Sequence, residues 1–176
     1  MEQFFNTAGP TIPADHYHLD PLARLDWEEI QHLVATKRYF VLHAPRQTGK
    51  TTTLLAMMKA LNEGGRYACA YANIEGAQAA RGDATQGIPA ACDAVARSIA
   101  LYLDAPAVQT WNQTQGRQQS AQDQLTALLT HWARTSAKPT VLLLDEVDAL
   151  VGDTLISLLR QIRAGYAQRP EFFPQS

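Results

Sequence analysis

The sequence of 176 residues has few of the features that mark redox, membrane or secreted proteins. Its two cysteines, Cys69 and Cys92, form no Cys-x-x-Cys pair, which predicts small core residues of a reduced protein rather than a redox site. No run approaches the roughly 20 apolar residues that cross a membrane, and the N-terminus lacks the basic and apolar pattern of a secretory signal. We therefore expect a soluble, cytoplasmic protein with no membrane partner.

The net charge is also small, and the sequence offers few clusters of metal ligands. The formal net charge of −2 gives no overall attraction to nucleic acid, although it leaves room for a local basic surface. His16 and His18 have no cysteine or third histidine nearby in the sequence to complete a zinc site. Because 46% of the residues are hydrophobic, the chain can bury one core. We expect an irregular leader over residues 1–25 and a single domain over residues 26–176.

The chain does have a phosphate-binding pattern. An apolar run at residues 39–43 predicts a strand, and it is followed by a loop and a helix start made of Ala44, Pro45, Arg46, Gln47, Thr48, Gly49, Lys50, Thr51 and Thr52. We expect these residues to surround a polyphosphate, because Gly49 allows a close turn and the helix beginning at Lys50 adds its positive end. Lys50 is expected to contact the β- and γ-phosphates, and Thr51 to ligate Mg²⁺.

Ala44 stands where the pattern usually has a glycine. Since alanine is the smallest substitute, we expect the loop to form all the same. The alternative interpretation is a helix start rich in lysine and threonine with no ligand, and the apolar run before the loop argues against it.

A second motif lies far downstream. Residues 140–144 read Thr-Val-Leu-Leu-Leu and precede Asp145 and Glu146, which predicts a buried parallel strand that ends in two carboxylates. Because ligands gather at the carboxyl ends of parallel strands, Asp145 and the Lys50 loop should meet in one site. We expect Asp145 to bind Mg²⁺ and Glu146 to orient and deprotonate the water that attacks the γ-phosphate.

Two alternatives to these carboxylate roles stay open. Taken alone, Asp145 and Glu146 could be solvated acids at a strand end, and only the phosphate loop favours the functional interpretation. Glu75 follows another predicted strand, at residues 67–74, and is the reserve candidate for the catalytic base, although a turn cap or a surface acid explains it better.

With these motifs the chain resembles the P-loop ATPases of the AAA-like superfamily, in particular prokaryotic proteins whose loop reads Pro-Arg-Gln-x-Gly-Lys-Thr. The matching segments are residues 5–24, residues 45–52 and Asp145-Glu146. The resemblance implies an α/β three-layer sandwich with a parallel sheet, and ATP with Mg²⁺ as the ligands. No Asn-Lys-x-Asp motif for guanine is present.

The resemblance also implies roles for residues outside the two motifs. Tyr17, Leu19 and Leu22 would lie near the base, although core packing explains each of them as well. An arginine near the last helix would reach the γ-phosphate of a neighbouring subunit in a homo-oligomer, and the candidates are Arg160, Arg163 and Arg169. Solvated surface arginines are the alternative.

The resemblance further implies an incomplete sheet. Three strands are visible in the sequence, at residues 39–43, 67–74 and 140–144, whereas the family places a further strand between the first and the third. We therefore expect an N-terminal piece of a longer ATPase domain that hydrolyses ATP slowly by itself. Direct pairing of the loop strand with the Asp-Glu strand is the alternative.

The remaining sequence predicts helices and one loop. The expected helices cover residues 27–37 with an Asp26 cap, 50–62, 89–103, 120–135 with caps from Ser120 and Asp123, and 153–165. The glutamine-rich residues 104–119 predict a mobile loop.

The leading interpretation is a Mg²⁺-dependent ATPase. The first alternative is a nucleotide-gated interaction or oligomerisation module with little turnover, and the second is a DNA-associated ATPase. The intact Asp145-Glu146 pair favours hydrolysis. The near-neutral charge argues against DNA as the partner.

Overall fold

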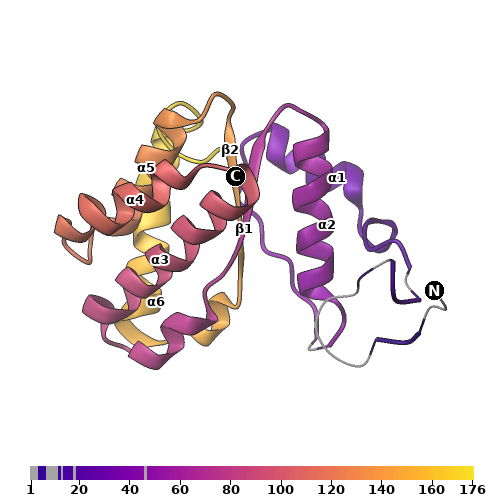
Figure 1. Ribbon diagram of the computed structural model, residues 1–176, viewed down its shortest axis with the longest axis horizontal. Helices are drawn as coiled ribbons and strands as arrows, with labels where there is room; N and C mark the ends of the chain where they lie inside the picture. The colour runs from indigo at the N-terminus through magenta and orange to yellow at the C-terminus, as the bar shows by residue number, and fades with distance from the viewer. Residues whose placement is uncertain (1–3, 7–11, 13, 18, 46) are drawn as a thin grey trace.

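Two parallel strands with helices on both faces organise the chain (Figure 1). The computed structural model describes residues 4–6, 12, 14–17, 19–45 and 47–176. β1 (Ala68–Asn73) pairs with β2 (Thr140–Asp145) in parallel, so that Asn73 stands opposite Asp145. The predicted α/β class, the parallel sheet and these two strands are confirmed.

The third expected strand does not form. Residues 39–45 are described but have no strand structure, and the sheet contains β1 and β2 alone within the described part of the chain. The prediction of a strand at 39–43 was therefore wrong. An apolar, extended segment becomes a strand only when a neighbouring strand bonds its backbone. The alternative of direct pairing between this segment and β2 is also wrong.

The edge of β2 that faces away from β1 meets the last residues of the chain instead. Alternate residues of a strand direct their backbone groups to opposite edges, and those of Thr140 and Leu142 point away from β1. The Gln175 amide donates to the Thr140 carbonyl at 2.7 Å, and the Leu142 amide donates to the Ser176 carbonyl at 3.0 Å. Within the described residues, β2 is thus bonded on its second edge near its start.

One face of the sheet carries α1 (Trp27–Ala35) and α2 (Lys50–Glu63), reached through the short 3-10 turn η1 (Leu22–Arg24). The Asp26 side chain accepts from the Glu29 amide at 3.0 Å, which confirms the predicted cap of α1. The buried residues of this layer are Ile30, Val34, Leu54, Met57, Leu61, Cys69, Tyr71, Val141 and Leu143.

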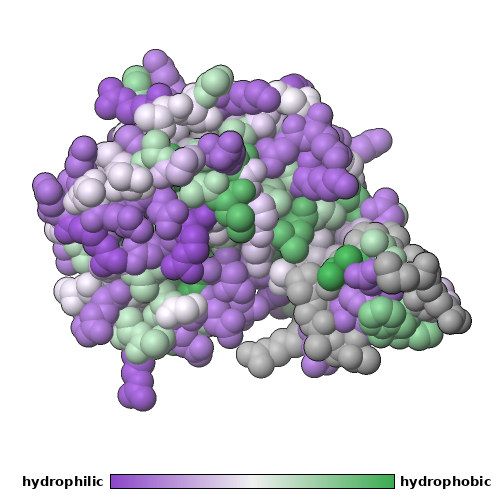
Figure 2. Space-filling model, in the orientation of Figure 1, coloured by the Kyte–Doolittle hydropathy of each residue, from purple (hydrophilic) through white to green (hydrophobic). Residues whose placement is uncertain are grey.

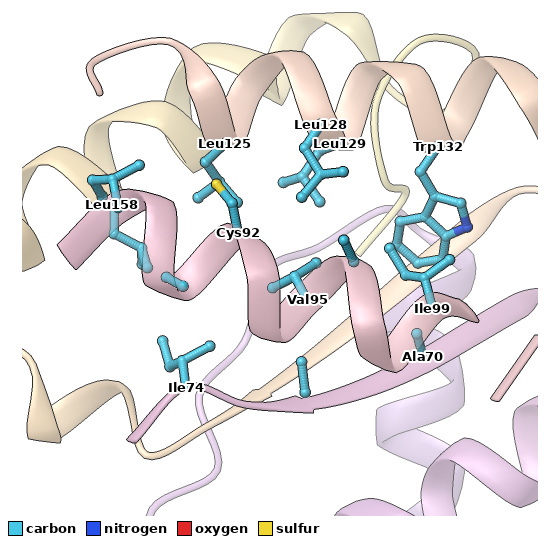
Figure 3. Packing of buried hydrophobic residues seen from close by; sticks show 14 of the residues in the cluster. Ala70, Ile74, Cys92, Val95, Ile99, Leu125, Leu128, Leu129, Trp132 and Leu158 are labelled. Carbon is cyan, nitrogen blue, oxygen red and sulfur yellow. The ribbon is translucent and has the colours of Figure 1, made fainter. Parts of the chain in front are cut away.

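The opposite face carries α3 (Ala84–Leu103), α5 (Gln124–Thr135) and α6 (Gly152–Ala164). Figure 3 shows the core between them and β1, which includes Ala70, Ile74, Cys92, Val95, Ile99, Leu125, Leu128, Leu129, Trp132 and Leu158. The connections contain η2 (Glu75–Ala80), α4 (Pro106–Thr114), η3 (Gly116–Gln118), η4 (Val147–Ala149) and η5 (Gly165–Gln168). Cys69 and Cys92 are both free and buried, as predicted.

Residues 104–119 contain α4 and η3, so the prediction of a mobile loop there was wrong. A few apolar contacts hold this polar segment. Val108 is buried in the core, and the Trp111 ring stacks on His131 of α5 with centroids 4.5 Å apart. The prediction rested on the glutamine content of the segment, which does not reveal these two contacts.

Two helix starts also differ from the prediction. α3 begins five residues before position 89, at Ala84, because the Asp83 side chain accepts from the Thr85 amide at 2.9 Å. For α5, neither predicted cap bonds the helix, since the Ser120 hydroxyl donates to the Asp123 carboxylate at 2.7 Å.

The described parts of the leader are largely irregular, with an isolated bridge between Phe4 and His16. Gly9, Pro10, Pro13 and His18 lie outside the described residues. Within the part of the chain that the structure covers, no helix has the length and apolar character needed to cross a membrane. On the face shown in Figure 2 the surface is mostly hydrophilic, with apolar side chains gathered near the junction of the two helical layers.

Candidate functional site

The loop before α2 has the backbone expected of an anion cradle. Gly49 is left-handed, with φ 85° and ψ 23°, and Gln47 also has a positive φ of 61°. The Thr48 hydroxyl donates to the Pro45 carbonyl at 2.7 Å and closes the loop. Among the described residues no side chain caps α2, and its first turn contains no acidic residue, so no carboxylate there offsets the positive end of the helix.

The predicted loop residues that the structure describes lead directly into the start of α2. Ala44 and Lys50 are partly buried, as are Thr51 and Thr52, and Arg46 lies outside the described residues. Lys50 is the first residue of α2, where its ammonium group adds a positive charge at the same end of the helix.

Arg24 is a cation at the loop to which the sequence assigned no role. Its Nη1 donates to the Thr48 carbonyl at 3.0 Å. The same nitrogen lies 3.7 Å from the point that a Cβ atom would occupy if Gly49 had one. The side chain comes from η1 and is exposed. Only the fold brings it to the loop, so the sequence held no signal for this contact.

Asp145, the last residue of β2, meets the loop helix directly. The Thr51 hydroxyl donates to Asp145 Oδ2 at 2.7 Å, and the Glu146 amide donates to Oδ1 at 3.0 Å. The carboxylate is buried, with 2% of Asp145 exposed. The two residues that the sequence expected to hold Mg²⁺ are therefore in contact.

Tyr71 of β1 is a further member of this cluster. Its hydroxyl donates to Asp145 Oδ2 at 3.1 Å. Burial, and then the neighbouring Asp145 charge, raise the pKa of Tyr71 above the usual tyrosine value, which keeps the hydroxyl a donor. Sequence reasoning missed Tyr71, because a tyrosine in a strand is ordinarily a core residue and its partner is known only from the register.

Glu146 adopts an unusual backbone conformation. Its φ of 60° and ψ of 34° are left-handed, and the chain turns at this point from β2 into η4. A residue other than glycine in this region costs on the order of 1–3 kcal/mol and persists where the surrounding structure requires it. The turn separates the direction of Glu146, which is partly exposed, from that of the buried Asp145.

Glu75, the reserve candidate, follows the end of β1. Its amide donates to the Asn73 side chain at 2.8 Å, and its own side chain is exposed. With Arg81 and Val151 it lines an open surface hollow of about 520 Å³. Glu75 and Glu146 thus both follow strand ends at the same edge of the sheet.

Of the three arginines considered near the last helix, Arg169 is engaged within the chain. It bonds the carbonyls of Lys37, Tyr166 and Gln175, and its guanidinium lies over the Tyr166 ring. Arg160 and Arg163 of α6 are exposed.

The three residues expected near the nucleotide base differ in their exposure to solvent. Tyr17 and Leu19 are exposed by 53% and 81%, whereas Leu22 packs against the α2 core layer. Leu22 therefore fits the packing alternative.

The donor set of the site suits a metal–phosphate ligand. Thr51 and Asp145 present a hydroxyl and a carboxylate, the oxygen ligands that Mg²⁺ takes alongside water and phosphate. Lys50 and the uncapped α2 terminus supply positive charge for a polyphosphate.

Comparison with models of known protein families gives a match. The model of a family described as AAA domain matches residues 33–170, which include the loop, both strands and α6. No curated protein and no solved structure matches the chain.

Proposed function

The chain belongs to the AAA domain family of P-loop ATPases, and on this basis we propose that it binds ATP with Mg²⁺ at residues 44–52 and hydrolyses it. We take residues 26–176 as the ATPase domain in this proposal. The observation that carries it is the 2.7 Å bond between the Thr51 hydroxyl and Asp145 Oδ2. That bond joins the phosphate loop to the Asp-Glu motif, which are far apart in sequence.

Binding is assigned to the loop and the start of α2. The backbone of residues 44–49 surrounds the phosphates, with Gly49 in the left-handed conformation that the turn requires. Lys50 pairs with the β- and γ-phosphates. Thr51 and Asp145 would hold Mg²⁺, which would supply positive charge to the bound polyphosphate.

Hydrolysis is assigned to Glu146. It orients a water molecule and takes a proton from it as the water oxygen bonds the γ-phosphorus. The bond between this phosphorus and the β–γ bridging oxygen breaks, and ADP leaves with that oxygen. The carboxylate suits this role because it is partly exposed, beside the buried Asp145.

A second candidate function is a nucleotide-gated module with little turnover. It is favoured by the absence of strand pairing for residues 39–45 within the described chain, which leaves the segment before the loop outside the sheet. Binding of ATP to the loop would then rearrange this segment rather than serve turnover. No comparable observation favours DNA as a partner.

Steady-state phosphate release separates the two functions. We expect Mg²⁺-dependent release by the natural sequence, and a loss of roughly 10²-fold or more in Glu146→Gln with ATP binding retained, because a positioned general base contributes on this scale. Glu75→Gln is the matched control at the neighbouring strand end. Loss of turnover in Glu75→Gln alone would reassign the base, and binding without any release would favour the gated module.

A further inference from the structure

We propose that Tyr71 is a positioning residue that holds the Asp145 carboxylate ready for Mg²⁺ and so sets the Mg²⁺ affinity of the site. The inference rests on the proposed function and adds to it a residue outside both sequence motifs. Its starting point is the 3.1 Å bond from the Tyr71 hydroxyl to Asp145 Oδ2.

The parallel register brings these two side chains together. Tyr71 stands opposite Leu143 in β2, two residues before Asp145, and all three belong to the face of the sheet that α2 covers. Tyr71 is 7% exposed, and its ring meets Tyr102 edge to face with centroids 6.3 Å apart. The ring is thereby held by packing, and the hydroxyl is left directed at the carboxylate.

A buried carboxylate needs such donors. Asp145 is 2% exposed, and a charge removed from water is costly unless it is paired or hydrogen-bonded. Thr51 and Tyr71 both donate to Oδ2, while the Glu146 amide donates to Oδ1. These bonds fix the orientation of both oxygens before any metal arrives.

Tyr71 differs from the other donors in having no further task in the proposed site. Thr51 is itself assigned to Mg²⁺, and the Glu146 amide is part of the backbone. Partners that orient a metal ligand typically contribute 10–100-fold to metal affinity. The Tyr71 hydroxyl can be removed without changing the ring, the loop or the ligand oxygens.

Titration of Mg²⁺ into the full 176-residue chain with ATP tests this role, with binding rather than turnover as the readout. We expect Tyr71→Phe to raise the Mg²⁺ concentration for half-saturation by about 10-fold. Binding of ATP in EDTA should change by less than about twofold, because the loop, Lys50 and the α2 terminus stay in place. Tyr102→Phe is the matched control, since it removes a hydroxyl from the tyrosine that packs on Tyr71.

The double variant with Asp145→Asn adds a readout that a purely structural tyrosine would not give. Once the carboxylate is an amide, Tyr71→Phe should have no further effect on the Mg²⁺ half-saturation. An equal effect in both backgrounds, an unchanged half-saturation in Tyr71→Phe, or an equal loss of binding in EDTA would each overturn the role of Tyr71. Absence of ATP binding by the natural sequence would overturn the proposed function itself, and it is recognised before any variant is compared.

Discussion

At the scale of single residues, the proposed site joins side chains that come from different elements: Thr51 and Tyr71 bond Asp145, and Arg24 bonds the backbone of the loop. The contact between Thr51 and Asp145 could be predicted, because a glycine before a helix and a carboxylate at a strand end are tied to phosphate and metal chemistry. Tyr71 and Arg24 could not, since their roles depend on a cross-strand register and on where η1 ends. No local pattern encodes either contact.

The backbone of Glu146 leads to a prediction about stability and activity together. Its left-handed conformation costs roughly 1–2 kcal/mol relative to glycine. Glu146→Gly should therefore lose turnover as Glu146→Gln does, while its free energy of unfolding stays equal to that of the natural sequence or rises by up to about 1 kcal/mol.

Urea denaturation of the two Glu146 variants, compared with the natural sequence, checks this expectation. Glu146→Gln keeps a side chain in the same conformation and serves as the control. A clear loss of stability in Glu146→Gly alone would mean that the glutamate side chain supports the fold, which contradicts its assignment as a free base.

At the scale of secondary structure, most elements follow from local patterns and the exceptions depend on distant partners. α1 and α2 begin where the sequence places them, because the Asp26 cap and the glycine before Lys50 are local signals. The segment at 39–43 had the apolar pattern of a strand, but no strand of the described residues pairs with it. The polar residues 104–119 became helical through contacts made by Val108 and Trp111.

The start of α5 illustrates a cap that comes from another helix. Gln161 of α6 is buried, and its Oε1 accepts from the Leu125 and Thr126 amides at 2.9 and 3.2 Å. Its Nε2 donates to the Ala121 carbonyl at 2.9 Å. One side chain from α6 thus bonds the backbone on both sides of the α5 start, which local sequence could not reveal.

Gln161→Leu should lower the free energy of unfolding by about 2–3 kcal/mol, because it leaves buried backbone groups unbonded. Chemical denaturation measures the change. Gln168→Leu is the control, since Gln168 is exposed and a surface change is expected to stay within about 0.5 kcal/mol. Equal effects of the two substitutions would show that Gln161 does not cap α5.

At the scale of the whole molecule, helices cover both faces of a narrow parallel sheet (Figure 1). The proposed site lies at the carboxyl end of β2, beside the start of α2. α2 and the loop belong to one layer, and the turns after β1 and β2 lead into the other. The three bonded side chains come from three different elements: Thr51 from α2, Tyr71 from β1 and Asp145 from β2. The class of fold was predictable from the two motifs, whereas this convergence required the three-dimensional register.

Every role proposed for the site depends on ATP binding at the loop before α2, and thermal unfolding with and without Mg²⁺-ATP measures this binding most directly. We predict that the ligand raises the unfolding temperature of the natural sequence, as any ligand that binds only the folded state does. Lys50→Ala should abolish the rise without changing the ligand-free unfolding temperature. Lys59→Ala, on the same helix but paired with Glu63 at the surface, should keep it. An equal rise in Lys50→Ala and the natural sequence would contradict the assignment of this loop.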